Sequence, residues 1–312
     1  MKTSLTMTQR VELYLTHRQR LGYTSRGIES GLLKFAECFD QAGYKGSLTT
    51  ALAIKWATAS KKTNRSAWAR RLTYLHGFAK YYQVIDPRTE IPPLNLYGSI
   101  YRRPTPYIYS EKEMHDLFSA TKKLVPVNGL KPITFKYLLG LLASTGLRIS
   151  EAIRLNRQDV DLNRGILMIH ETKFHKSRYV PLHKTTQKAL SRYALIRDKK
   201  IRIPSGSEFF IIDNGYPLNL GQTERDFKWL REDLGWKKRP RLYDFRHTFA
   251  CQRLLKWYKE RKNINEMMIY LSTYLGHVRV TDTYWYLTAV PELMLIVSKK
   301  FEQFSRSVQG EQ

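Results

Sequence analysis

The stretch Tyr274–Leu287, YLGHVRVTDTYWYL, places the strongest constraint on the fold of this chain. Gly276 followed by His277 predicts the end of a helix and then a loop, because glycine often takes the position after the last helical residue. Thr281 is a suitable N-cap and predicts a final helix that carries Tyr286. His277 and Tyr286 are nine residues apart, which would place them on opposite faces of one helix. The two side chains can share a site only if a loop intervenes.

A second pattern lies upstream, in the stretch Arg241–Leu255, RLYDFRHTFACQRLL. Tyr243 and Arg246 are three residues apart, about one helical turn, so both side chains can face one phosphate. His247 is rotated away from that face by about a quarter turn. We therefore predict that His247 packs against its neighbours, and the helix geometry argues against a direct role in chemistry.

The third pattern is TGLRISEAIRL, Thr145–Leu155. Gly146 predicts the end of one helix, and Arg148 stands at the start of the next. Glu151 follows three residues later and so lies on the same face as Arg148. An arginine in this position can point out of a helix start toward an anion while the glutamate holds its orientation.

The fourth pattern is the clearest β signal in the chain. Gly165–Glu171 and Arg178–Leu182 predict two short strands, joined by the polar and basic turn TKFHKS at 172–177. Lys173 lies in this turn, where a lysine can reach into a groove and deliver a proton. Most turn lysines are only solvated, so this pattern gains weight only beside the other three.

Charge indicates the class of partner. The 312 residues include 53 Lys and Arg against 27 Asp and Glu, a formal net charge of +26. Residues 1–103 hold 17 basic and 6 acidic side chains, so the positive charge is spread over the whole length. Such a field concentrates polyanions, and it favours a protein that wraps nucleic acid over a neutral enzyme with a basic tail.

Other compositional features exclude several classes. The two cysteines, Cys38 and Cys251, are too few for a disulfide scaffold and do not form a CxxC zinc motif. No segment approaches the ~20 apolar residues that a membrane span needs. The N-terminus has no apolar stretch of signal-peptide length. We expect a soluble protein of the cytoplasm, associated with the nucleoid and not with a membrane.

In this order and spacing, the four patterns resemble the tyrosine recombinase (phage integrase) family, in a transposon or Xer-like form. The family signature is an arginine, a lysine, His-x-x-Arg, a histidine or tryptophan, and a tyrosine nine residues after the last histidine. The resemblance assigns these positions to Arg148, Lys173, Arg246, His277 and Tyr286. The same register favours Tyr286 as the nucleophile over its neighbours Tyr284 and Tyr274.

The resemblance implies a mainly helical (α+β) fold of two domains. Residues 1–87 would form a helical, SAM-like core-binding domain that contacts DNA, and 88–106 an extended interdomain linker. This assignment fits the five prolines between Asp86 and Pro106. Residues 107–312 would form the catalytic domain, mostly helical with a small antiparallel sheet. Ser110–Glu113 is a capping box that predicts the first helix of this domain.

The resemblance also implies a chemistry. Tyr286 would attack a backbone phosphorus in line, giving a 3′-phosphotyrosyl link and a free 5′-hydroxyl. Arg148 and Arg246 would offer planar, permanently charged forks to the transition-state oxygens, and Lys173 would protonate the departing 5′-oxygen. We expect no cofactor: the link conserves bond energy, so ATP is not needed, and the sequence offers no acidic cluster for a metal.

One position departs from the family pattern. Tyr243 stands where the family usually has histidine, three residues before the second arginine. A neutral imidazole accepts a proton near pH 7, whereas a phenol of ordinary pKa near 10 does so poorly. Tyr243 can still donate a hydrogen bond to a phosphate oxygen. We expect an active enzyme whose general-base help is weaker or comes from elsewhere.

The implied partner is double-stranded DNA, clamped between the two domains, with four protomers acting on two DNA sites. Integration or transposition of a mobile element belongs to the same implication, whereas the kind of element, a chromosomal role and the need for companion recombinases stay open. The segment from Pro291 to Phe301 has an apolar face that would dock either on a neighbouring protomer or within its own domain. Two other functions stay open: a type IB topoisomerase-like enzyme, and an architectural or regulatory DNA-binding protein with a decayed site, which only Tyr243 favours.

Overall fold

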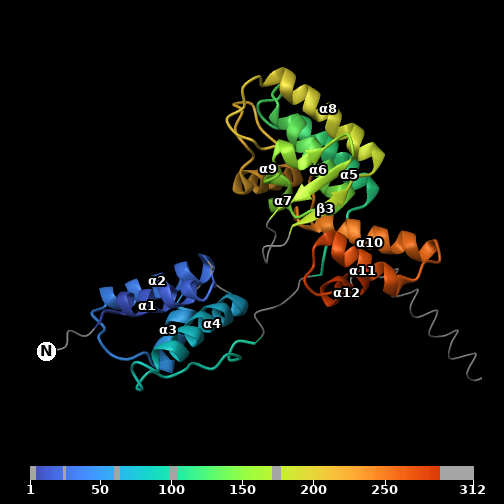
Figure 1. Cartoon of the computed structure of the whole chain (residues 1–312). Coiled ribbons are helices and arrows are strands. Elements are labelled where there is room, and N and C mark those ends of the chain that lie inside the picture. The colour runs from blue at the N-terminus through green and yellow to red at the C-terminus, as the bar shows by residue number, and fades with distance from the viewer. Residues whose placement is uncertain (1–4, 24–25, 60–63, 99–104, 171–176, 289–312) are drawn as a thin grey trace, which may run out of the picture. The chain divides into compact units, whose positions relative to one another are not determined.

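A computed structural model describes the chain except for residues 1–4, 24–25, 60–63, 99–104, 171–176 and 289–312 (Figure 1). Lys173 and the segment from Pro291 to Phe301 therefore lie outside the described residues. The chain divides into two compact units, Met1–Pro104 and Thr105–Gln312. Each unit is described by itself. Among the described residues, no helix is both long enough and apolar enough to cross a membrane.

The described residues of the first unit form four helices, α1 (Met7–Arg20), α2 (Arg26–Gln41), α3 (Thr50–Thr58) and α4 (Arg65–Tyr82). Each of the four contributes to one core, because apolar side chains recur along it at helical spacing. The members of this core that are fully buried include Val11, Leu32, Phe35, Ala53, Leu72, Leu75 and Phe78.

The proline-rich segment after α4 packs on the first unit over much of its length. The Glu90 backbone N–H donates to the Leu48 carbonyl at 2.8 Å, and the Gln83 side chain donates to the Thr89 carbonyl at 2.8 Å. Ile91 and Tyr97 pack against the core of the unit. The predicted linker at 88–106 therefore overlaps the first unit, since its backbone and apolar side chains find partners there.

The second unit opens with α5 (Glu111–Ala120), whose N-cap Ser110 forms the predicted capping box with Glu113. It continues through α6 (Lys131–Thr145) and the short α7 (Ile149–Ile153). Two single 3₁₀ turns, η1 (Thr121–Lys123) and η2 (Arg157–Asp159), join these elements to their neighbours. Helices α8 (Lys184–Lys200) and α9 (Leu220–Asp233) follow the sheet.

A three-stranded antiparallel sheet lies between α7 and α8 in the chain, in the order β1 (Val160–Asp161), β2 (Ile166–Ile169) and β3 (Arg178–Pro181). The pairing of Leu167 with Val180 and of Ile169 with Arg178 sets the register of β2 and β3. The predicted hairpin is present, with both strands shorter than expected. Strand β1 was not predicted.

The last three helices of the described residues, α10 (Asp244–Lys259), α11 (Ile264–Leu275) and α12 (Thr281–Thr288), lie together at one end of the second unit (Figure 1). They share a small core of their own, formed by Phe249, Ala250, Cys251, Leu254, Met268, Leu271, Leu275 and Tyr286. The sequence therefore predicts the fold class correctly: the part of the chain that the structure describes is mainly helical, with one small antiparallel sheet in the second unit.

Candidate active site

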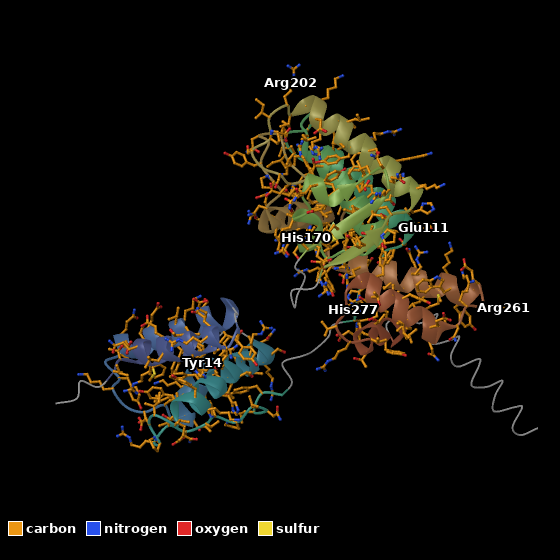
Figure 2. The ribbon with its side chains drawn as sticks, in the orientation of Figure 1. Tyr14, Glu111, His170, Arg202, Arg261 and His277 are labelled. Carbon is orange, nitrogen blue, oxygen red and sulfur yellow. The ribbon has the colours of Figure 1, made fainter. Side chains whose placement is uncertain are left out.

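Four of the predicted site residues come together through ends of elements. Arg148 is the N-cap of α7, and Arg246 lies in the first turn of α10. His277, which Figure 2 labels, lies in the loop between α11 and α12, and Tyr286 lies in α12 itself. The interposed loop brings His277 and Tyr286 together as predicted. The fifth residue, Lys173, is outside the described residues.

Arg246 occupies the buried centre of this arrangement, with 0% of its surface exposed. Its Nη1 donates to the Gly146 carbonyl at 3.0 Å, and its Nη2 donates to the Leu275 carbonyl at 2.6 Å. These carbonyls stand at the C-terminal ends of α6 and α11, where the helix dipole is negative. Nε is buried with no protein partner. Burial lowers the pKa of Arg246, yet an arginine stays charged.

Both helix ends that face Arg246 are built by glycine. Gly146 and Gly276 follow α6 and α11 with φ of 63° and 68°, the left-handed conformation that ends a helix and favours glycine. A Cβ on Gly146 would also lie 2.6 Å from the Phe249 ring. The two glycines predicted as helix ends therefore turn the chain and leave room for packing beside the site.

Arg148 is held by the glutamate predicted to orient it. Its Nη1 donates to Glu151 Oε1 at 2.6 Å, and Glu151 Oε2 accepts the Arg148 backbone N–H at 3.1 Å. Glu151 is also bound by Arg178, from β3, at 2.9 Å. Burial raises the pKa of Glu151, but the hydrogen bond and charge of Arg178 and the charge of Arg148 outweigh it, and the pKa is lowered. Glu151 is thus a buried carboxylate between two guanidinium groups.

Tyr286 lies between two imidazoles. Its ring stacks on His277 with centroids 6.0 Å apart, and it meets the edge of His247 at 5.3 Å. Burial raises the pKa of the Tyr286 phenol, while the charge of Arg246 and a hydrogen bond from it act in the opposite direction. The side chain is 2% exposed, so the closed site of the free protein covers its candidate nucleophile.

The two imidazoles are held neutral at physiological pH. Burial, then the charges of Arg246 and Arg148, lower the pKa of His277 to about 3. Burial also lowers the pKa of His247 to about 4. His277 Nδ1 bonds to Thr283 Oγ1 at 2.7 Å, whereas His247 Nδ1 is buried with no protein partner. Both rings can therefore accept a proton.

Tyr243, the residue that departs from the family pattern, lies at the start of α10 and is 40% exposed. Its ring contacts His247 edge to face, with centroids 5.1 Å apart. His247 thus bridges Tyr243 and Tyr286. The quarter turn that separates it from Arg246 points it toward α12, so sequence reasoning underrated its contact with the site.

Sequence reasoning also missed Arg178. A signal was present, because Arg178 and the buried Val180 share one face of β3 and an arginine on the buried face of a strand requires a partner. No group of three or more His, Cys, Asp or Glu side chains suited to a metal ion occurs in the part of the chain that the structure describes.

Comparison with known proteins gives a consistent result. The model of the phage integrase family matches residues 108–292. The "Putative integrase/recombinase y4rB" of Sinorhizobium fredii is 38% identical over 308 residues, 96% of this chain and 98% of the relative. The "Tyrosine recombinase XerC" of Staphylococcus saprophyticus is 24% identical over 230 residues, 72% of this chain and 71% of the relative.

Among solved structures, the Tn1549 transposon integrase in complex with a circular intermediate DNA resembles this chain with a TM-score of 0.66. The identity is 17%, and the match covers 91% of this chain and 95% of the other. At that identity the likeness concerns the fold. None of these relatives favours the topoisomerase-like or architectural alternatives.

Proposed function

The chain belongs to the phage integrase family and is a tyrosine-type site-specific DNA recombinase, and from that premise we propose that Tyr286 is its nucleophile, with Arg148, Arg246, His277 and Lys173 as the other catalytic residues. The observation that carries the proposal is the position of Tyr286. Its ring lies against His277, and the charge of the buried Arg246 guanidinium, from α10, favours ionisation of its phenol.

In the proposed reaction, the Tyr286 oxygen attacks a backbone phosphorus of double-stranded DNA. The new bond is a 3′-phosphotyrosine, and the bond to the 5′-oxygen breaks. Arg148 and Arg246 stabilise the charge that develops on the non-bridging oxygens, as preorganised donors do in other transferases. Because the phosphotyrosine conserves the bond energy, the reverse attack by a 5′-hydroxyl reseals a strand without ATP.

Two protons must move in this reaction. The phenol proton leaves Tyr286, and the bases that we propose for it are the neutral imidazoles of His277 and His247, whose rings pack against the ring of Tyr286. Tyr243 supplies no imidazole, so His247 is the group next to it that takes over the accepting role. The departing 5′-oxygen gains a proton from Lys173, the one site residue outside the described part of the chain.

The site must open before it can bind a phosphate. Arg246 and Tyr286 are 0% and 2% exposed, so a DNA backbone cannot reach them in the closed arrangement. We propose that DNA binding displaces α12, which covers Arg246 with Tyr286. In this arrangement the buried Tyr286 does not react before DNA is bound.

The wider assembly extends the proposal. The net charge of +26 suits a protein that encloses duplex DNA between a core-binding domain at 1–87 and a catalytic domain at 107–312, joined through 88–106. We propose that four protomers exchange strands between two sites, with or without companion recombinases, in the integration or transposition of a mobile element. We propose that this work takes place at the nucleoid, because the substrate is DNA.

The test is covalent trapping on nicked suicide duplexes cut from the DNA that flanks the coding sequence. After cleavage, the short fragment between the cut and the nick, which carries the free 5′-hydroxyl, diffuses away. Resealing is therefore prevented. We expect an adduct that resists SDS with the wild type and with Tyr284→Phe, and none with Tyr286→Phe. An undiminished adduct from Tyr286→Phe would reject the assigned nucleophile.

A further inference from the structure

Arg178 contacts two parts of the site that are far apart in sequence. Its Nη2 binds Glu151 Oε2 at 2.9 Å and its Nη1 binds Glu151 Oε1 at 3.3 Å. Its Nε donates to the Tyr274 carbonyl at 2.9 Å, in the last turn of α11. We infer that Arg178 is a positioning residue that fixes Arg148 for the scissile phosphate, an inference that rests on the function proposed above.

The first argument is charge. Glu151 and Arg148 alone would form a neutral pair, and a neutral pair attracts a phosphate weakly. Arg178 binds both oxygens of the same carboxylate, so the three side chains together keep one positive charge. The three side chains differ in how far they are exposed to solvent. The side chains of Glu151 and Arg178 are 4% and 11% exposed, whereas that of Arg148 is 24% exposed. Arg148 is therefore the member of the set that can face DNA.

The second argument is geometry. Arg178 reaches Glu151 with two parallel hydrogen bonds, the fork-to-fork arrangement that fixes both orientation and distance. Glu151 in turn holds the side chain and the backbone N–H of Arg148. Because Arg178 holds both oxygens of the Glu151 carboxylate, the Arg148 guanidinium bound to that carboxylate is preorganised, and preorganised donors are what stabilises a transition state most.

The third argument is the close approach of α11. Arg148 Nη2 lies 3.4 Å from the Gly276 carbonyl, and a Cβ on Gly276 would lie only 2.8 Å from Arg178 Nη1. The two arginines thus meet the same glycine, one residue before His277. Arg178 also opens β3, the strand that follows the segment containing Lys173. One side chain therefore joins α7, which Arg148 caps, to the end of α11, just before His277.

The experiment compares two scissile groups in the suicide duplexes, an ordinary phosphate and a methylphosphonate. The methyl group replaces a charged oxygen, so it removes much of the need for Arg148. We expect Arg178→Gln to slow adduct formation on the phosphate by ~100-fold, the scale of losing one preorganised donor. On the methylphosphonate we expect the rate of adduct formation by Arg178→Gln to stay within about threefold of the wild-type rate, by the same reasoning. Arg148→Gln should show the same pattern, and Arg178→Lys should restore part of the rate on the phosphate.

The matched control is Arg197→Gln. Arg197 is also a buried arginine, with its side chain 5% exposed and paired with Asp198, but it lies in α8. We expect this variant to form the adduct at close to the wild-type rate on the phosphate and on the methylphosphonate. Thermal melting and gel shifts confirm that each variant folds and binds the duplex.

Three results would overturn the inference. An Arg178→Gln variant as fast as the wild type on phosphate removes the role altogether. An equal loss on both substrates shows a structural role without action through Arg148. If the wild type forms an adduct on none of the duplexes, the proposed function is rejected, and the inference with it. The wild type alone therefore distinguishes a failure of the proposed function from a failure of the inference about Arg178.

Discussion

At the scale of single residues, the site depends on groups whose burial controls their charge. His277 and His247 lie against Tyr286, and burial is the largest cause of the low pKa of each, about 3 and about 4. The charges of Arg246 and Arg148 lower the pKa of His277 further, while Asp282 raises it. Burial therefore keeps both rings beside the phenol in the neutral form.

These shifts predict how stability depends on pH. The folded pKa of each imidazole is below its ordinary 6.5, so the unfolded chain binds the protons first as pH falls. The stability that the two neutral imidazoles contribute to the folded state is fully present above pH 6.5 and is lost as the pH falls toward 4 and then 3. We expect the free energy of unfolding in urea to fall by on the order of 2–4 kcal/mol between pH 7.5 and pH 5.

The control for this prediction is the double variant His247→Gln, His277→Gln. Its free energy of unfolding should change much less over the same pH interval, whatever its absolute stability. If the wild type and the double variant show the same pH dependence, the two imidazoles are not the groups responsible.

At the scale of elements, the site is made by the places where helices end. The carbonyl ends of α6 and α11 hold Arg246, and both helices end in a left-handed glycine. The loop after Gly276 then returns the chain so that α12 lies beside α10, where Cys251 contacts the Tyr286 carbonyl. The proposed catalytic groups are therefore set by turns between helices more than by the helices themselves.

Gly276→Ala tests this arrangement. Its φ of 68° is unfavourable for alanine by roughly 1–2 kcal/mol, and the new Cβ would press on Arg178. Gly235→Ala is the matched control, because Gly235 has φ of 66° and nothing within 4 Å of a Cβ. We expect similar losses of melting temperature in both variants, but at least ~10-fold slower adduct formation only in Gly276→Ala. Equal rates in the two variants would contradict the role of the α11 end.

Local signals explain what the sequence predicted well. The capping box at Ser110 and the helix end at Gly146 each depend on residues within one turn, and both are present. Strand β1 was missed because Val160–Asp161 is too short to show alternation. Arg178 was missed because its partners Glu151 and Tyr274 lie 27 and 96 residues away in sequence. Contacts over such distances depend on tertiary packing.

At the scale of the whole molecule, charge and separate cores define the character of the protein. The first unit has its own core around Phe35 and Leu72, and the second has a core around Phe135 and Leu139. Positive charge is distributed over both units, since residues 1–103 hold 17 basic side chains and 6 acidic ones. Such a chain is suited to contact DNA backbone with each unit.

Binding should therefore depend steeply on salt. With roughly 6–10 phosphate contacts, affinity for a random duplex falls about 10³–10⁵-fold between 50 and 200 mM salt. We expect fluorescence anisotropy of the full chain on a 30-base-pair random duplex to show a loss in this range. A loss smaller than tenfold would mean that few phosphates are contacted and that the charge serves another purpose.

The central claim is that Arg148, Lys173, Arg246 and His277 surround the point that the hydroxyl of Tyr286 reaches. The most direct measurement is mass spectrometry of the trapped protein–DNA adduct after trypsin and nuclease digestion. Tyr284 and Tyr286 both follow Arg279 with no intervening lysine or arginine, so one tryptic peptide contains both. Fragmentation of this peptide should place the nucleotide on Tyr286. A nucleotide on Tyr284, or on any other residue, would contradict the account.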